Sequence, residues 1–446
     1  MIRIALGTLL CVLLAACGGG GGSSVANSSP TPPDTSTPET PPPDNGPVLT
    51  AYRASSPYAS RLPSCVLAET RADACALSQL PLVGSEGQVT REAVMQRLVV
   101  SHDWMGVRFE ELLQRLPDDV VQMFGAVSGV VISYDIRPSF YWRLTNAIYL
   151  DPADLWLTND EKATIYTEPD YRSGFGSALL FISIWDYMLN DNFAWDYYPL
   201  DGTEERTIDD IILTNAQLIL HELAHANDVF PPSYWNSLDI TKKPDLAAYD
   251  LVNEWASEKL SRQYPLSSEL MLDVAEVLFQ GVEASESILA LTANDLGMAM
   301  STDAANDDYN YHTSREDVAM MFEEAMMAYL FGTDRVVAFL DRPAVDNPTC
   351  NDYLTGWGER GRVAAPQIQP RLAMVLEHIL PNLNSAAVID SLPPVLPFEQ
   401  GVGYCDNIRQ TSSQRNLRAN EVPRIDGQAA EPNLYLRLHP NRLSLE

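Results

Sequence analysis

The chain has 446 residues, a formal net charge of −31 and a hydrophobic share of 46%. Nucleic acids and anionic membrane surfaces are themselves negative, so this charge disfavours both as partners and favours basic ones. The length and the apolar share are sufficient for a large buried core, so most of the chain is expected to fold around one.

The first 16 residues predict an export signal. Residues 4–16 form an apolar run that is too short to span a bilayer as a mature helix. The run ends in Leu-Ala-Ala-Cys at 14–17, which resembles the lipobox of bacterial lipoproteins. The resemblance implies that Cys17 carries lipid, palmitate included, and anchors the protein in the membrane. Gly18 after it implies the outer membrane of a Gram-negative bacterium. A simple secretory signal cleaved after Ala16 is the alternative.

Residues 17–50 are predicted to form the lipid anchor and a flexible tether. The stretch is rich in Gly, then in Pro, Ser and Thr, and cannot bury much apolar surface. Residues 51–446 are predicted to form one α+β domain, mostly helical, in which 51–125 could be an N-terminal helical part. The apolar run at 177–188 is interrupted by Asp186, so we expect a buried strand or short helix and no membrane span.

The patterning changes period along the domain. Apolar residues at helical spacing predict helix over 90–124, and short runs rich in β-branched and aromatic residues predict strands at 130–134, 147–150 and 155–157. These strands predict a small mixed sheet packed on the helix that follows. The half of the chain after Pro232 is expected to be helical, with helices near 247–262, 267–279, 315–331 and 370–380.

A His-Glu-x-x-His pattern lies at 221–225. A capping box at Thr207 and the absence of Gly or Pro over 208–228 place the pattern in the last turns of one helix. Histidines four residues apart share a helix face, so His221 and His225 can bind one metal ion. Glu222 beside them can accept a proton from a water activated there, which is the chemistry of zinc peptidases. An ordinary amphipathic helix with two histidines is the alternative.

A catalytic zinc commonly has three protein ligands, so a third ligand is needed from elsewhere. Glu254 lies in a segment, 253–258, that resembles the Asn-Glu-x-x-Ser-Asp helix of thermolysin-like peptidases. Its predicted helix face is a continuous polar strip, which is stable in water without a metal. Asp228 is one turn past His225 and suits a supporting or capping role better. Glu323 remains a further candidate.

Glu316 is the preferred third ligand. It shares a predicted helix face with Met320, Glu323 and Met327, and a carboxylate among apolar side chains requires a compensating cation. The segment resembles the Glu-x-x-Ala-Glu helix of lethal-factor-like zinc peptidases, although Met320 replaces the closing Glu. This partial resemblance implies a gluzincin-like metallopeptidase whose Zn²⁺ is bound by His221, His225 and Glu316. A capping role for Glu316 towards Thr313 is the alternative.

The same resemblance places an assisting tyrosine seven residues before Glu316, at Tyr309. We expect Tyr309 to donate a hydrogen bond to the oxyanion of the reaction, with Tyr311 and His312 as alternatives. The expected activity is zinc-dependent hydrolysis of a peptide or protein substrate by an envelope lipoprotein. The competing hypothesis is a non-catalytic binding or scaffold lipoprotein with a structural or vestigial metal site. Substrate, oligomeric state and the side of the outer membrane stay open.

Four cysteines remain besides Cys11 in the signal and Cys17 at the anchor. Four cysteines allow three pairings, and an exported protein favours disulfides over free thiols. Proximity in the sequence favours Cys65 with Cys75 and Cys350 with Cys405.

Overall fold

The computed structural model describes residues 46–167 and 172–419. The predicted signal and most of the predicted tether lie outside these residues. The chain from Val48 onward clusters as one compact unit, and its first strand, β1, begins at Thr50. None of the helices in the described ranges is long and apolar enough to cross a membrane.

The first sheet contains five short strands in the order β1-β2-β3-β5-β4. These are β1 (Thr50–Ala51), β2 (Leu98–Val100), β3 (Gly129–Ile132), β4 (Phe140–Trp142) and β5 (Ala147–Leu150). The β2–β3 and β3–β5 pairs are parallel and the outer pairs are antiparallel, so the sheet is mixed as predicted. Strand β4 pairs with β5 alone in this sheet and is therefore an edge strand.

Two local predictions around this sheet are wrong. The predicted helix over 90–124 is divided into α2 (Arg91–Met95), α3 (Asp103–Arg115) and α4 (Asp118–Met123), with strand β2 after α2. A three-residue apolar run fits a strand and a helix equally well, and here pairing with β3 decides. The strand predicted at 155–157 is absent, because the N–H groups of Leu155 and Trp156 donate to the Pro152 carbonyl of the 3₁₀ turn η3 (Pro152–Asp154) and that of Leu157 donates to the Glu161 side chain.

A second sheet of five antiparallel strands was not predicted, and three of its strands interrupt the half of the chain that was expected to be helical. Its order is β10-β9-β8-β6-β7. The strands are β6 (Phe181–Leu189), β7 (Asn192–Phe193), β8 (Asp334–Asp341), β9 (Thr355–Arg360) and β10 (Leu396–Pro397). Strand β6 falls in the apolar run for which strand or short helix was expected.

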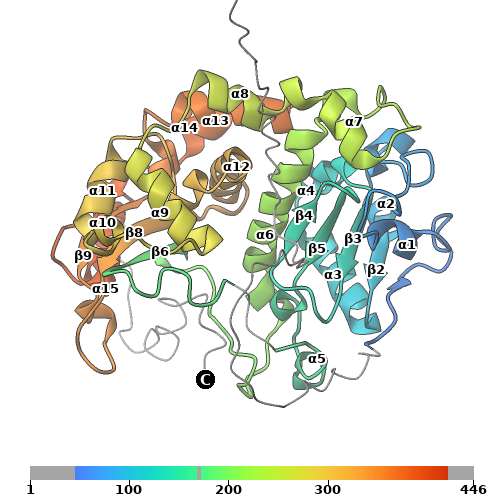
Figure 1. The fold of residues 1–446 in the computed structure, drawn as a ribbon. Helices are drawn as coiled ribbons and strands as arrows, with labels where there is room; N and C mark the ends of the chain where they lie inside the picture. The colour runs from blue at the N-terminus through green and yellow to red at the C-terminus, as the bar shows by residue number, and fades with distance from the viewer. Residues whose placement is uncertain (1–45, 168–171, 420–446) are drawn as a thin grey trace, which may run out of the picture. The chain divides into compact units, whose positions relative to one another are not determined.

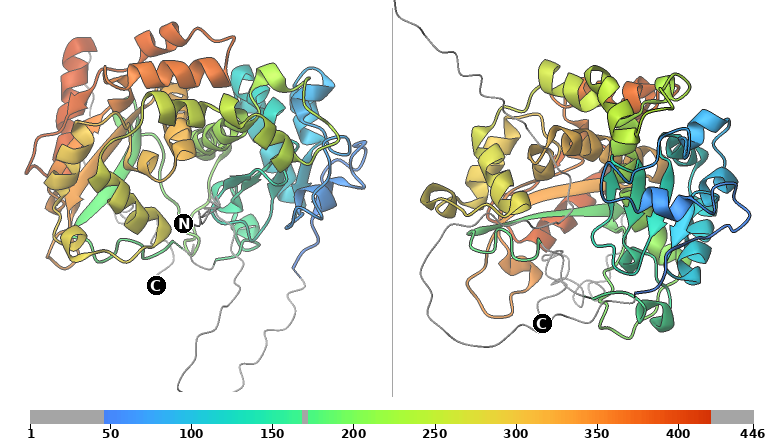
Figure 2. Two further views of the ribbon diagram at one scale, coloured as in Figure 1. Left: turned by 45° about the horizontal axis from the view of Figure 1, so that its top comes forward. Right: turned by 45° about the vertical axis from the view of Figure 1, so that its right-hand side comes forward.

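The motif helix is α6 (Ile208–Val229), which begins at the predicted capping box of Thr207 and Asp210. It lies between the two sheets and packs along α12 (Ser314–Phe331), as Figure 1 shows. One hydrophobic core cluster has members from β3, β5, α6 and α12. Figure 2 gives two further views of the sheets around these helices.

The remaining helices complete the fold. They are α1 (Leu62–Val66), α5 (Asn159–Lys162), α7 (Pro244–Asp250), α8 (Ala256–Gln263), α9 (Glu269–Gln280), α10 (Glu286–Leu289), α11 (Ala293–Ser301), α13 (Gln369–Ile379), α14 (Ser385–Ser391) and α15 (Tyr404–Ala419). The other 3₁₀ turns are η1 (Val83–Glu86), η2 (Phe124–Ala126), η4 (Pro232–Tyr234), η5 (Val252–Glu254), η6 (Asp308–Tyr311), η7 (Cys350–Asp352) and η8 (Arg362–Ala364).

The helices predicted at 267–279, 315–331 and 370–380 are confirmed as α9, α12 and α13. The single helix predicted at 247–262 is instead α7, η5 and α8. The break has a cause: Asp228 accepts both the backbone N–H and the hydroxyl of Ser257, which starts α8 as a new helix.

Both predicted disulfides are confirmed. Cys65 pairs with Cys75, and Cys350 pairs with Cys405. The second disulfide joins the η7 turn to the first residues of α15, across 55 residues of sequence.

Candidate metal centre

Three ligand atoms converge between α6 and α12. The Nε2 atoms of His221 and His225 lie 3.2 Å apart, and a Glu316 oxygen, Oε2, lies 3.0 Å and 3.3 Å from them. Atoms bound at 2.0–2.1 Å to a tetrahedral zinc are about 3.3 Å apart. The near-equilateral triangle therefore fits a metal ion, and the three residues could hold one.

The helix geometry explains this convergence. His221 and His225 are one turn apart on α6, with ring centroids 4.8 Å apart and ring planes at 84°. Glu316 lies in the first turn of α12, where Thr313 caps its backbone N–H and leaves its carboxylate for the histidines. The capping alternative thus accounts for the backbone of Glu316 and not for its side chain.

The other candidates for third ligand lie elsewhere. Glu254 is in η5, with a side chain 43% exposed and paired with Lys259 at 2.9 Å. Asp228 is buried and accepts hydrogen bonds from Ser257 in the first turn of α8. Its carboxylate therefore caps α8. Glu323 contacts the other nitrogen of His221. Of these carboxylates, only that of Glu316 contacts both Nε2 atoms.

Glu323 orients His221 from behind. Its Oε2 lies 2.9 Å from His221 Nδ1, and its Oε1 accepts a hydrogen bond of 2.8 Å from Tyr187 on β6. A carboxylate at Nδ1 favours the tautomer that carries its proton there and presents Nε2 to a metal. Glu323 is fully buried, and Arg335 on β8, at 3.9 Å, compensates its charge. Arg335 also pairs with Asp307 at 2.8 Å.

The electrostatics of the triangle favour bound positive charge. Burial acts to raise the pKa of Glu316, but the two histidines lower it well below its usual range. Burial acts to lower the pKa of His221, but Glu316 and Glu323 raise it well above its usual range. Both shifts have one cause, since buried carboxylates need a cation beside them, and a metal ion would supply that charge.

Glu222 is the titratable group beside the triangle. It is 5% exposed, and burial raises its pKa, while the charges of His221 and His225 act in the opposite direction. Its carboxylate accepts the backbone N–H of Tyr141, in the edge strand β4. A carboxylate with a raised pKa, held beside ligands for a metal, is suited to accept a proton from water.

The tyrosines differ in their surroundings. The Tyr309 ring lies nearly parallel to His221, with centroids 6.4 Å apart and planes at 26°, and it packs against Phe279 and His312. Tyr311 is buried and its hydroxyl donates to Asp303 at 3.1 Å, so it holds η6 in place. Burial lowers the pKa of His312. The structure thus puts Tyr309 beside the candidate ligand His221, and the hydroxyl of Tyr311 is already bonded to Asp303.

Sequence reasoning missed three groups that support the site. They are the backbone N–H of Tyr141, the hydroxyl of Tyr187 and the guanidinium of Arg335. Arg335 carried only a weak signal, because a charged residue directly before the apolar run 336–340 can be either exposed or buried with a partner. Tyr187 carried none, since its partner is 136 residues away in sequence.

The Glu323 contact predicts a measurable effect. We expect Glu323→Gln to lower zinc affinity by about ten- to a hundredfold, because the uncharged amide supports the His221 tautomer less well. The matched control is Glu324→Gln, on the same helix and equally buried, which contacts Asn306 and not the histidines. Competition with a fluorescent zinc chelator measures both affinities. Equal affinities in the two variants would show that Glu323 does not support the site.

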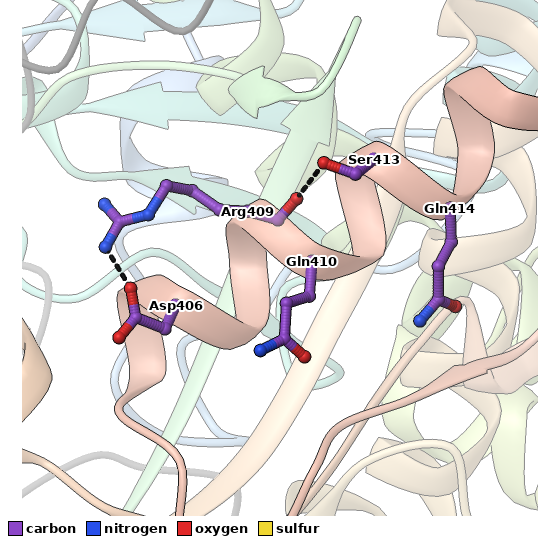
Figure 3. A pocket seen from close by; sticks show the side chains of 5 residues that line it. All are labelled: Asp406, Arg409, Gln410, Ser413 and Gln414. Carbon is purple, nitrogen blue, oxygen red and sulfur yellow. Dashed lines mark hydrogen bonds and ion pairs between the residues drawn. The ribbon is translucent and has the colours of Figure 1, made fainter.

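Other features carry less chemistry. His102 bonds to Ser101 and His378 contacts the Asp228 carbonyl, while His439 lies outside the described residues. An open hollow beside α15 has walls from a single helix, where Arg409 donates to Asp406 and Ser413 donates to the Arg409 carbonyl (Figure 3). The hollow is lined by polar side chains of this one helix and brings no residues of other elements together.

Comparison of the chain with protein-family profiles, with curated proteins and with solved structures finds no match.

Proposed function

We propose that the protein is a zinc-dependent peptidase. The observation that carries the proposal is the triangle of His221, His225 and Glu316, with ligand atoms 3.0–3.3 Å apart and Glu222 beside it. Two imidazoles and one carboxylate, with a fourth position left for water or substrate, are the ligand set of catalytic zinc.

The residues divide the chemistry among them. A zinc ion, when bound, supplies a Lewis acid that polarises a carbonyl and lowers the pKa of a water. Glu222 accepts the proton of the attacking water and returns it to the leaving amine, a role that its raised pKa favours. Glu323 and Tyr187 keep His221 in the orientation that the reaction needs.

In this proposal, the substrate peptide binds along the edge of the first sheet. We infer that this sheet packs on α6, because their residues share one core cluster and the N–H of Tyr141 reaches Glu222. That N–H points away from β5, so the outer edge of β4 faces the site. An extended peptide could add to this edge as a further strand, with main-chain hydrogen bonds that are independent of its sequence.

Tyr309 is proposed to stabilise the oxyanion. We expect Tyr309→Phe to lower kcat by about a hundredfold with zinc content unchanged, because one hydrogen-bond donor to the transition state is lost. Tyr311→Phe is the matched control: it removes a bond to Asp303 and should lower thermal stability without lowering kcat of the folded protein. The reverse pattern would transfer the role to Tyr311. Kinetics on a purified peptide substrate, with thermal melting, separate the two outcomes.

The proposed setting is the cell envelope, with the peptidase anchored through lipid on Cys17. This part of the proposal rests on the lipobox resemblance alone. Mass spectrometry of the purified membrane form should find an N-terminal, lipid-modified Cys17. An unmodified N-terminus after residue 16 would leave a secreted peptidase instead.

The experiment for the proposed function is digestion of a mixture of unrelated peptides by the purified protein, with products identified by mass spectrometry. We expect cleavage that 1,10-phenanthroline abolishes and added zinc restores. A protein that binds zinc and yields no product would favour the alternative, a binding or scaffold lipoprotein with a structural metal site. The burial of the site, with the three ligand side chains 6–13% exposed, is the observation consistent with that alternative.

A further inference from the structure

Two arginines share one indole ring. The Cζ atom of Arg143 lies 5.4 Å, and that of Arg315 5.2 Å, from the ring centroid of Trp255. The distance between the two Cζ atoms therefore cannot exceed the sum of these two distances. Trp255 is 1% exposed, whereas both arginines are half-buried. A rigid, buried aromatic face thus holds two positive groups that solvent can still reach.

This cluster adjoins the proposed zinc site. Arg315 directly precedes Glu316 in the first turn of α12. Trp255 lies two residues before Ser257, which is bonded to Asp228 near the end of α6. Helix α12 therefore carries Arg315, and α6 anchors the segment that carries Trp255.

The register of β4 places the cluster along the substrate. The N–H of Tyr141 contacts Glu222, the group beside the reacting bond in the proposed mechanism. Arg143 is two residues farther along, the first residue of the turn that follows β4. A peptide paired with the outer edge of β4 would place a residue about two positions from its scissile bond near Arg143.

Arg315 is not neutralised by a salt bridge within the described residues, although the chain as a whole is acidic. The chain has 29 Lys and Arg against 60 Asp and Glu, yet Arg315 has no carboxylate partner among the residues that the structure describes. An anion bound beside Arg315 would supply the partner that this arginine lacks there.

We propose, on the basis of the peptidase function above, that Arg143 and Arg315 bind a carboxylate of the substrate about two residues from the scissile bond. The source is an acidic side chain or a free C-terminal carboxylate. Guanidinium groups match a carboxylate in shape and hydrogen bonding, and the Trp255 ring fixes their orientation before the substrate arrives. The enzyme therefore selects acidic peptides, although its net charge alone would favour basic ones.

The test starts from a peptide that the wild-type protein cleaves at a single identified bond. Four versions of this peptide are compared by kcat/KM, in two pairs. The first pair has Glu or Gln two residues from the scissile bond. The second pair ends at that position, with a free C-terminal carboxylate or with a carboxamide. In at least one of the two pairs, the charged peptide should have a kcat/KM about tenfold or more above that of its neutral partner. The preference should hold for a carboxylate on one side of the scissile bond only. Preference in the first pair identifies a side chain as the source, and preference in the second identifies the C-terminus.

The variants Arg143→Gln and Arg315→Gln should each reduce this ratio of charged to neutral kcat/KM to near one. Arg409→Gln on α15 is the control, an exposed arginine paired with Asp406, and should keep the wild-type ratio. A ratio that stays high in the double variant would overturn the proposal. If the variants do not fold, the wild-type ratio decides alone, and a ratio near one overturns the proposal.

Failure of this inference and failure of the proposed function give different results. If the protein cleaves all four peptides equally, it is a peptidase and the carboxylate site is wrong. If no peptide from any mixture is cleaved in the presence of zinc, the peptidase function fails and the carboxylate site fails with it.

Discussion

Glu222→Gln is expected to lower kcat/KM for peptide hydrolysis by about a thousandfold and to leave zinc bound. The glutamine keeps the shape of the side chain but cannot accept a proton, and a positioned general base contributes about 10²–10⁴-fold to such a reaction. Glu222 does not belong to the three residues that could hold the metal ion, so zinc content should remain close to one ion per chain.

The control for this variant is Glu258→Gln, which removes an exposed carboxylate paired with Arg262 on α8. Its kcat/KM should equal that of the wild-type protein. Peptide kinetics and atomic absorption on the same preparations provide both numbers. Full activity in Glu222→Gln would disprove the role of Glu222, and loss of zinc would show that Glu222 belongs to the metal site itself.

Glu316→Ala is expected to lose zinc, and Glu254→Ala is expected to keep it. The first removes the oxygen that contacts both His221 and His225, and the second removes a carboxylate paired with Lys259 on the surface. Loss of an outer partner of a ligand already costs about ten- to a hundredfold in affinity, so loss of a ligand should cost at least a hundredfold.

Zinc titration with a competing chelator measures both affinities, and circular dichroism verifies the fold. Glu316→Gln is the conservative version, because it keeps the volume of a buried side chain and removes only its charge. Retention of zinc in Glu316→Ala together with its loss in Glu254→Ala would exchange the two assignments and contradict the geometry.

Sequence patterns within single helices were sufficient to predict the three residues of the candidate metal centre. The pair His221 and His225, the capping box at Thr207 and the Met-lined face around Glu316 all follow from helical spacing over short distances. The structure brings these three side chains together because α6 and α12 pack side by side and both are long enough to keep their predicted faces. The preference for Glu316 over Glu254 had a sound basis, since a carboxylate in a buried helix needs a cation.

The structure pairs Glu254 with Lys259, but the single helix on which its prediction was based does not form. That prediction assumed one helix over 247–262, whereas the chain breaks at η5 and begins again as α8. The break depends on Asp228, which bonds to Ser257 from 29 residues away. Contacts of this kind depend on tertiary packing, and local patterning does not contain them.

The second sheet and its contribution to the site were beyond local rules for the same reason. Strands β6 and β8 pair across about 150 residues, and only that pairing brings Tyr187 and Arg335 to Glu323. The edge strand β4 has three residues, too few for its alternation to be recognised. Its position beside Glu222 is what makes it relevant to function.

An anomalous difference map at the zinc absorption edge, from crystals of the zinc-loaded protein, tests the central claim most directly. The account predicts one strong peak at about 2.0–2.2 Å from the Nε2 atoms of His221 and His225 and from a carboxylate oxygen of Glu316. A map with no peak between these residues, or with a peak whose third protein ligand is another carboxylate, would contradict it.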